Sequence, residues 1–305
     1  MPKIRTLLRV ALIVLGVLVG GVLVLAATFA IANRTNGSLV SSSERRRYLL
    51  YVPESLDPTQ PAPLVISMHG FAEWPAHQRD ISRWNALADE HGFIVVYPMG
   101  TGFPLRWRTH GAPGTEADRA IDVTFISDLI GALAPDYAID PARIYVNGLS
   151  NGGGMSFAVA CDLADRIAAF GSVSGAYMLA WDACQPSRPV PAIIFHGTAD
   201  EIVPYEGGPS HAFDLPFPTI PAWVETLAQR NGCTAAEALP TTGDVRGVAC
   251  TGCAADVVFY TVDGGGHAWP GGGWMPEAIV GHITQDIDAT RVMWAFFEQH
   301  PLRDH

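Results

Sequence analysis

A serine enclosed by glycines is the residue of this chain with the clearest chemical potential. Ser150 stands in Gly148-Leu-Ser-Asn-Gly152, directly after the β-branched run Ile144-Tyr-Val146 and before a segment of small residues. Glycines leave room for a tight strand-to-helix turn, and such a turn exposes the serine for nucleophilic attack. The helix start also favours negative charge that develops beside it. We expect Ser150 to be a nucleophile; the competing interpretation is a glycine-rich helix entry with an idle serine.

A serine hydroxyl is a weak nucleophile until a base, oriented by a third group, activates it. His267 is the predicted base, because it follows the apolar run 257–262 in the flexible loop Asp-Gly-Gly-Gly-His-Ala-Trp-Pro. His196 ends a strand before a glycine, so we expect it to be structural. The histidines in plausible range beyond the serine are His196, His211, His267, His282 and His300, and His305 lies in the C-terminal tail.

The predicted acid is Asp200, which lies just past the buried run 192–195 in Ala-Ile-Ile-Phe-His-Gly-Thr-Ala-Asp. A carboxylate at that strand end can orient the imidazole and stabilise its protonated form. Asp263 is the rival, but it lies four residues before His267 in the same loop and should not reach behind the ring. The three residues together predict acyl transfer.

Acyl transfer also needs N–H groups that bind the developing oxyanion. The backbone N–H of Asn151, directly after the nucleophile, is one candidate. The second should come from the loop that follows the strand 64–68, in His69-Gly70-Phe71, and we choose the N–H of Phe71. The alternative for His69-Gly70 is a plain strand end.

Alternating strands and helices must position these residues. Apolar strands separated by helices indicate a mostly parallel central sheet with helices on both faces, in one α/β domain over 45–305. Strands are expected at 48–52, 64–68, 93–97, 144–146, 170–174, 192–195 and 257–262. Helices are expected at 82–90, 122–134, 151–165, 219–230 and 286–299.

Composition and charge limit the kinds of molecule that the chain is expected to bind. Apolar residues make up 49% of the 305 and charged residues 16%, which is enough for a large core. The formal charge of -11 argues against nucleic acid as a partner, because phosphate binding needs clustered Lys and Arg. No cofactor is predicted. Cys250 and Cys253 have the spacing of metal ligands, but no second pair or histidine cluster accompanies them, so no metal is expected either.

The N-terminal segment 1–32 is predicted to direct export. Lys3, Arg5 and Arg9 precede an unbroken run of apolar or small residues over 10–32, which as a helix would cover about 34 Å and could cross a bilayer. An uncleaved anchor is favoured by this length, whereas Ala30-Ile-Ala32 would suit cleavage of a signal peptide. In both cases the rest of the chain lies outside the cytoplasm, and the polar segment 33–44 serves as a tether.

Four ordered strings carry a resemblance to a known family: SMHGF, GLSNGGGM, HGTADEIVPYEGG and DGGGHAWPGG. From about Arg45 to Phe297 the chain resembles the polyhydroxybutyrate depolymerase and feruloyl esterase group of carbohydrate esterase family 1. The resemblance implies the α/β-hydrolase fold and a triad of Ser150, Asp200 and His267. It also implies an oxyanion hole at Phe71 and Asn151.

The cysteines fit an exported protein. All five lie in the second half, and the odd number leaves one unpaired in a disulfide framework. We expect the pairs Cys161–Cys184 and Cys233–Cys253, which the resemblance favours, with Cys250 left over.

Aromatic residues near the motifs suggest the substrate. Trp107, Tyr205 and Trp269 are predicted to contact it, and Trp74 and Trp274 lie in similar loops. Such walls suit a phenolic ester, a feruloylated polysaccharide or a hydroxyalkanoate, although packing between loops would explain half of them equally well. Two other functions stay open: a non-catalytic exported binding module, and an acyltransferase or peptidase with the same triad.

Overall fold

The computed structural model describes residues 2–32, 34–109, 119–210 and 216–302, without the side chains of residues 2–11, 26, 29, 31 and 32. The chain divides into two compact units, Met1–Arg34 and Thr35–His305. Every residue with a predicted chemical role belongs to the second unit.

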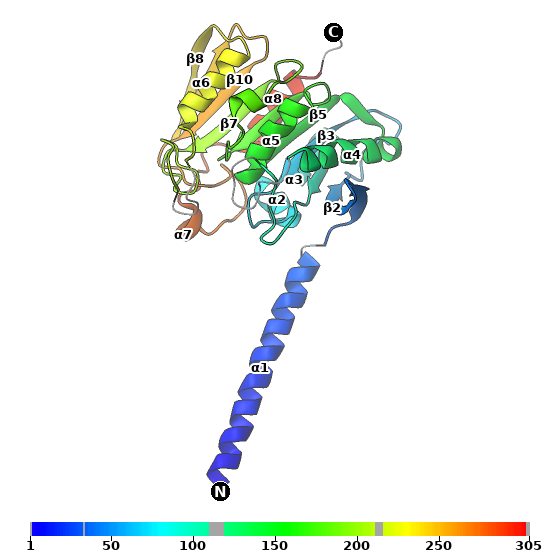
Figure 1. The fold of residues 1–305 in the computed structure, drawn as a ribbon, viewed down its shortest axis with the longest axis vertical. Helices are drawn as coiled ribbons and strands as arrows, with labels where there is room; N and C mark the ends of the chain where they lie inside the picture. The colour runs from blue at the N-terminus through cyan, green and yellow to red at the C-terminus, as the bar shows by residue number, and fades with distance from the viewer. Residues whose placement is uncertain (1, 33, 110–118, 211–215, 303–305) are drawn as a thin grey trace. The chain divides into compact units, whose positions relative to one another are not determined.

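A mixed sheet forms the centre of the second unit (Figure 1). In the part of the chain that the structure describes, it has ten strands in the order β1-β2-β4-β3-β5-β6-β7-β10-β9-β8. The central strands pair in parallel, which confirms the predicted α/β class. In sheet order they are β4 (Ile94–Pro98), β3 (Ala62–Met68), β5 (Ile139–Leu149), β6 (Ala169–Val173), β7 (Ala192–Gly197) and β10 (Val257–Val262).

Helices cover both faces of this sheet. Because successive strand residues point to opposite faces, Leu64 joins one core cluster and Val65 joins the other. The first cluster is closed by α4 (Ala120–Tyr137), α5 (Asn151–Asp162) and α6 (Ile220–Arg230). The second is closed by α3 (Trp84–His91) and α8 (Ala289–Gln299), with a contribution from α2 (Pro75–Ser82). The short helices are η1 (Trp181–Ala183) and α7 (Glu277–Val280).

The antiparallel edges of the sheet depart from the sequence analysis. At one edge, β1 (Gly37–Ser41) pairs with β2 (Glu44–Tyr51), so part of the segment expected to be a tether is a sheet strand. At the other edge, β8 (Ala235–Thr242) and β9 (Val245–Thr251) form a hairpin that was not predicted. Almost every residue of β8 is exposed, so its sequence lacks the apolar alternation that marks a half-buried strand.

The first unit is a helix, α1 (Pro2–Ala32), which fits the helical form assumed for the apolar run. Among residues with described side chains, no helix is both long and apolar enough to span a membrane. The N-terminal anchor therefore stays a prediction.

The disulfide pairing is confirmed. Cys161 of α5 is bonded to Cys184, which follows η1, and Cys233 is bonded to Cys253. Cys250 carries a free thiol, and burial raises its pKa. Since Cys253 is in a disulfide, it is no partner for Cys250 in a metal site.

Candidate active site

The parallel strands bring the predicted residues to one edge of the sheet. Phe71 follows β3, Ser150 follows β5, Asp200 follows β7 and His267 follows β10. Carboxyl ends of parallel strands lie at the same edge, which is where open α/β sheets bind their ligands. Residues up to almost 200 positions apart therefore lie in one loop cluster.

Ser150 occupies a strained turn between β5 and α5. Its φ of 56° and ψ of -119° lie in a region that a residue with a side chain rarely adopts. The turn is possible because Gly152 lacks a Cβ, which would lie 2.2 Å from the carbonyl oxygen of Met68. The backbone N–H of Ser150 donates to the oxygen of Val173 at 2.9 Å and so ties the turn to β6.

Asp200 and His267 are in direct contact. Nδ1 of His267 lies 2.8 Å from Oδ2 of Asp200, and both side chains are buried. The other carboxylate oxygen accepts the backbone N–H groups of Ile202 and Val203 at 2.9 and 2.8 Å, which fixes its orientation. Because an ionised carboxylate only accepts, Nδ1 carries the proton, and Nε2 is the basic nitrogen of the neutral ring.

The two side chains shift each other's pKa. Burial alone would lower the pKa of His267, but the charge and hydrogen bond of Asp200, helped by the charge of Glu73, raise it above the usual value. Burial would likewise raise the pKa of Asp200, yet the two histidines beside it, His267 and His196, hold it well below its usual range. The pair is therefore built to stabilise a protonated imidazole beside a carboxylate.

The rival residues are engaged elsewhere. Asp263 forms a paired hydrogen bond with Arg246, at 2.7 Å for each oxygen, and contacts no histidine in any described interaction. His196 is fully buried, with Nε2 2.9 Å from the oxygen of Val203 and 3.3 Å from Oδ2 of Asp200. It supports Asp200 from behind, in line with the structural role expected of it. His211 lies outside the described residues.

His69 shapes the loop that is predicted to bind the oxyanion. Nε2 of this buried ring accepts the N–H of Gly100 at 3.0 Å, so Nδ1 must carry the proton and donate to the oxygen of Gly70 at 2.7 Å. Burial lowers the pKa of His69, which keeps the ring neutral and this pattern intact. The His69-Gly70 pair is thus more than a plain strand end, while the role of the Phe71 N–H stays a prediction.

Sequence reasoning missed Glu73. One of its carboxylate oxygens accepts the N–H of Gly70 at 2.9 Å, and the other lies 3.4 Å from Nδ1 of His77. Burial would raise the pKa of Glu73, but His77 and the Gly70 N–H lower it, so the group is ionised. The only signal in the sequence was a carboxylate three residues after a strand-end glycine, a spacing that is common in turns.

The Asn151 side chain has a role beside that predicted for its backbone. Its Oδ1 accepts the N–H of Trp107 at 2.7 Å, and its Nδ2 donates to Oγ1 of Thr109 at 2.9 Å. Asp122 at the start of α4 holds the same loop by accepting the N–H of Arg108 at 2.6 Å. The helix after the nucleophile is thereby fastened to the loop that carries Trp107.

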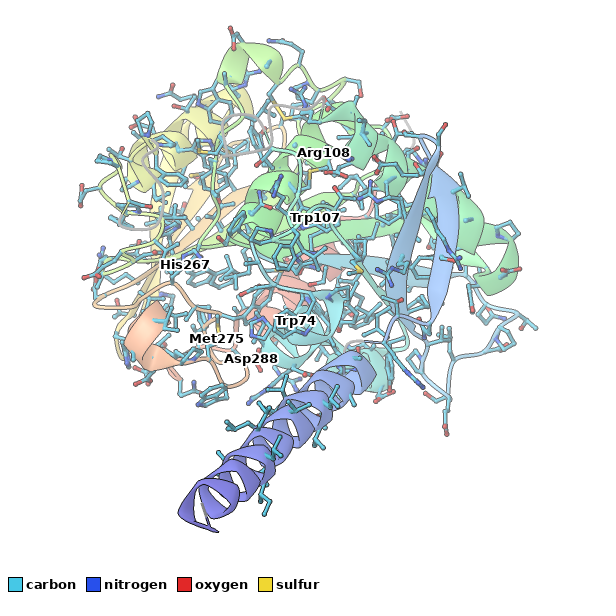
Figure 2. All side chains as sticks on the ribbon, turned by 60° about the horizontal axis from the view of Figure 1, so that its bottom comes forward. Trp74, Trp107, Arg108, His267, Met275 and Asp288 are labelled. Carbon is cyan, nitrogen blue, oxygen red and sulfur yellow. A yellow bond between two sulfur atoms is a disulfide. The ribbon has the colours of Figure 1, made fainter. Side chains whose placement is uncertain are left out.

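Two of the predicted aromatic contacts with substrate are corrected, those of Trp269 and of Trp107, which is labelled in Figure 2. Trp107 is 0% exposed and donates its indole N–H to the oxygen of His69 at 2.9 Å, so it supports the loop from inside. Trp269 is also 0% exposed, and its N–H donates to Thr290. The hydroxyl of Tyr205 lies 3.2 Å from that of Thr261, but Tyr205 is half-buried, so its contact with substrate stays a prediction. The indole N–H groups of Trp107 and Trp269 are satisfied inside the protein, as expected of structural aromatics.

The described residues of this site offer no set of metal ligands. Over the described ranges, no group of three or more His, Cys, Asp or Glu side chains is arranged to hold a metal ion. The chemical groups that the strand ends do gather are a serine, an imidazole and a carboxylate.

Known proteins resemble this chain in sequence. A family model described as esterase PHB depolymerase matches residues 46–186. A bifunctional acetylxylan esterase/xylanase of Neocallimastix patriciarum is 34% identical over 52% of this chain and 22% of that protein. Feruloyl esterase B of Piromyces equi is 32% identical over 75% of this chain and 44% of that protein. The chain spans less than half the length of these two relatives. A probable feruloyl esterase C of Aspergillus terreus is 27% identical over 86% of this chain and 87% of that protein.

Solved structures resemble the fold. Acetyl xylan esterase from Aspergillus awamori has a TM-score of 0.55 at 17% sequence identity, over 76% of this chain and 93% of that one. An S-formylglutathione hydrolase from Agrobacterium tumefaciens has a TM-score of 0.56 at 13% identity, over 87% of this chain and 94% of that one. Likeness at these identities concerns the fold alone. In sequence the chain is similar to the esterase PHB depolymerase family, whose model matches residues 46–186, and its fold is the α/β-hydrolase fold.

Proposed function

We propose that this protein is an exported hydrolase of carboxylic esters that acts through Ser150, His267 and Asp200. The observation that carries the proposal is the 2.8 Å contact between His267 and Asp200, at the sheet edge where Ser150 stands in its strained turn. The matching family model and the relatives named as esterases point to the same reaction.

In the first half of the reaction, the hydroxyl of Ser150 attacks the ester carbonyl while Nε2 of His267 takes its proton. Asp200 holds Nδ1 and stabilises the imidazolium that forms. The oxyanion is bound by the backbone N–H groups of Phe71 and Asn151, beside the N-terminus of α5. His267 then gives its proton to the leaving alcohol, and an acyl-enzyme results.

In the second half, His267 accepts a proton from water, and the hydroxide equivalent attacks the acyl-enzyme. As the second tetrahedral intermediate collapses, His267 gives its proton to the leaving oxygen of Ser150, and the acid is released. The substrate class that we propose is an ester of a phenolic acid, such as a feruloyl ester, because two relatives that match over 75% and 86% of the chain are named feruloyl esterases. A hydroxyalkanoate oligomer is the second candidate, from the description of the family.

The test is a pair of serine variants. Ser150→Ala should abolish hydrolysis of p-nitrophenyl butyrate and labelling by a fluorophosphonate. Ser156→Ala, on the same helix, should keep both, because that hydroxyl only donates to the oxygen of Gly152 within α5. Full activity of Ser150→Ala would overturn the assignment, and a wild-type chain that never reacts with the probe would point to a non-catalytic binding module.

Product analysis then separates the remaining alternatives. Methyl ferulate, feruloylated xylan oligosaccharides and 3-hydroxybutyrate oligomers should give free acid in water if the protein is a hydrolase. Transfer of the acyl group to an added alcohol, or cleavage of peptides, would identify an acyltransferase or a peptidase with the same triad.

Export is the second part of the proposal. Disulfides form in oxidising compartments, so the two disulfides support a location of the second unit outside the cytoplasm. The N-terminal segment 1–32 would direct export and remain as a membrane anchor. Cell fractionation with mass spectrometry of the mature N-terminus tests this: an intact N-terminus in the membrane fraction is expected, whereas cleavage after Ala32 would identify a signal peptide.

A further inference from the structure

A cavity of about 350 Å³ lies at the far end of α5 from Ser150. Ser150 precedes the first residue of α5, whereas Cys161 near the end of this helix lines the cavity, about 16 Å away along the helix axis. Phe170 at the start of β6 and Val190 just before β7 also line it. The cavity is therefore near the amino ends of the strands, opposite the edge that carries the triad.

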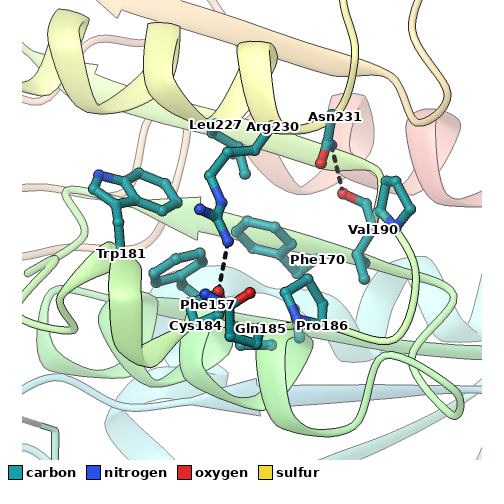
Figure 3. A pocket seen from close by; sticks show the side chains of 13 residues that line it. Phe157, Phe170, Trp181, Cys184, Gln185, Pro186, Val190, Leu227, Arg230 and Asn231 are labelled. Atoms are coloured by element: carbon teal, nitrogen blue, oxygen red, sulfur yellow. Dashed lines mark hydrogen bonds between the residues drawn. A yellow bond between two sulfur atoms is a disulfide. The ribbon is translucent and has the colours of Figure 1, made fainter.

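The walls of this cavity are mainly apolar, and several are aromatic (Figure 3). Phe157 and Phe170 are buried, and Trp181 meets the ring of Phe157 edge to face at 5.2 Å. The disulfide between Cys161 and Cys184 holds the segment after η1 over α5 and closes one side. The space is within the range of sites for small molecules, and it suits a single aromatic ring.

Arg230 is the one basic residue that lines the cavity, and none of the lining residues is acidic. Arg230 at the end of α6 donates through Nη2 to the oxygen of Cys184 at 2.6 Å, and its guanidinium lies 5.4 Å from the centre of the Trp181 ring. A guanidinium has five N–H donors, and this bond uses one of them. Asn231 closes the neighbouring wall by donating to the oxygen of Val190 at 2.9 Å.

We infer that this cavity binds a small monocarboxylate with an aromatic body, with the carboxylate at Arg230 and the ring among Phe157, Phe170 and Trp181. A single guanidinium matches one carboxylate and not a polyanion, and the aromatic walls favour a ligand that carries a ring. The inference goes beyond the proposed function, since binding needs no hydrolysis. If the proposed function holds, the ligand is of the same chemical class as the released acid.

Equilibrium dialysis of the full chain with 4-hydroxycinnamate tests the inference. Ser150 is first blocked with a fluorophosphonate, so that the acid cannot occupy the active site. One site per chain should remain, and 4-hydroxycinnamamide, which lacks the charge, should bind at least about tenfold more weakly. Loss of all binding after the block would overturn the inference.

Two variants locate the site. Arg230→Gln should weaken binding about tenfold through loss of a charge-assisted hydrogen bond, whereas Arg291→Gln, which removes an exposed arginine paired with Glu90, should not change it. Leu227→Trp should fill the cavity and abolish binding. Binding that is unaffected by both Arg230→Gln and Leu227→Trp would show that the acid binds elsewhere.

Hydrolysis of p-nitrophenyl butyrate by each unblocked variant serves as the folding control. Arg230→Gln and Leu227→Trp should retain it, because neither residue is part of the triad or of the oxyanion loop. If Ser150 fails to react with the fluorophosphonate, the proposed function falls, while the effect of Arg230→Gln on binding still decides the inference.

Discussion

The carboxylate of Glu73 accepts the backbone N–H of Gly70 at 2.9 Å, inside the loop that is predicted to bind the oxyanion. A Cβ on Gly70 would lie 2.9 Å from that carboxylate oxygen and 3.4 Å from Cβ of Ser150. Oε2 of Glu73 and Cβ of Ser150 are therefore no farther apart than the sum of these two distances. Glu73 holds the loop at Gly70 in place, but it also brings a negative charge near the reacting atoms. The neighbouring His77 partly balances that charge.

Substitution of Glu73 should separate these two effects. Glu73→Ala leaves the buried N–H of Gly70 without its acceptor, so kcat should fall about tenfold as the loop loses its shape. Glu73→Gln keeps an acceptor oxygen and removes only the charge, so its kcat should stay within a few-fold of wild type. Steady-state kinetics with p-nitrophenyl butyrate measures both, and equal losses in the two variants would show that the charge, and not the hydrogen bond, matters.

The pH dependence should report the raised pKa of His267. The imidazole must be neutral to take the proton of Ser150, so kcat/KM falls as the pH drops through the His267 pKa. Because Asp200 and Glu73 raise this pKa, the acid limb should lie above the ordinary histidine value of 6.5. Glu73→Gln removes one of the two negative charges that raise the pKa of His267, so the acid limb of the pH profile should move to lower pH. A limb at the same pH in both proteins would mean that Glu73 does not act on His267.

Asp200→Asn tests the other partner of His267. An amide in place of the carboxylate can stabilise the wrong tautomer and no longer balances the imidazolium, so kcat should fall by a factor of about 10⁴. The residual activity should come from the oxyanion loop and binding alone. A loss below tenfold would reassign the acid, with Asp263→Asn as the matched control, since Asp263 pairs with Arg246 at the surface.

The sequence predicted the residues whose position depends on the central strands. Ser150, Asp200 and His267 each follow a run rich in β-branched or aromatic residues, which predicts a buried strand, and parallel strands share their carboxyl edge. That rule needs no knowledge of side-chain contacts. It therefore holds even where the connecting loops are long.

The features of the site that the sequence did not predict depend on contacts between loops. The acceptor role of Glu73 depends on the path of a turn, and the burial of Trp107 depends on its indole reaching the oxygen of His69. Neither leaves a periodic pattern in the sequence. The β8–β9 hairpin was missed for a related reason, because an exposed edge strand carries no apolar stripe.

The nucleophile turn should tolerate no side chain at Gly152. A Cβ there would meet the backbone oxygens of Met68 and His69 at 2.2 and 2.6 Å, so β3 or α5 must shift. Gly152→Ala should lower the free energy of unfolding by about 1–3 kcal/mol and also lower kcat, since the shift displaces Ser150. The control is Gly131→Ala in α4, where nothing lies within 4 Å of the new methyl group; it should raise stability by about 0.5–1 kcal/mol. Urea unfolding measures both, and a neutral Gly152→Ala would contradict the close approach.

The disulfide from α5 should contribute to stability but not to catalysis. Cys161 and Cys184 are 23 residues apart, so loss of the bridge in a double alanine variant should lower the free energy of unfolding by about 3 kcal/mol. Since the bridge is at the end of α5 remote from Ser150, kcat at 25 °C should remain close to wild type. Thiol titration of oxidised, unfolded wild-type protein should detect only Cys250. A large loss of kcat in a variant that is still folded would mean that the far end of α5 helps to hold the nucleophile, because a shift there would have to travel the length of the helix to reach Ser150.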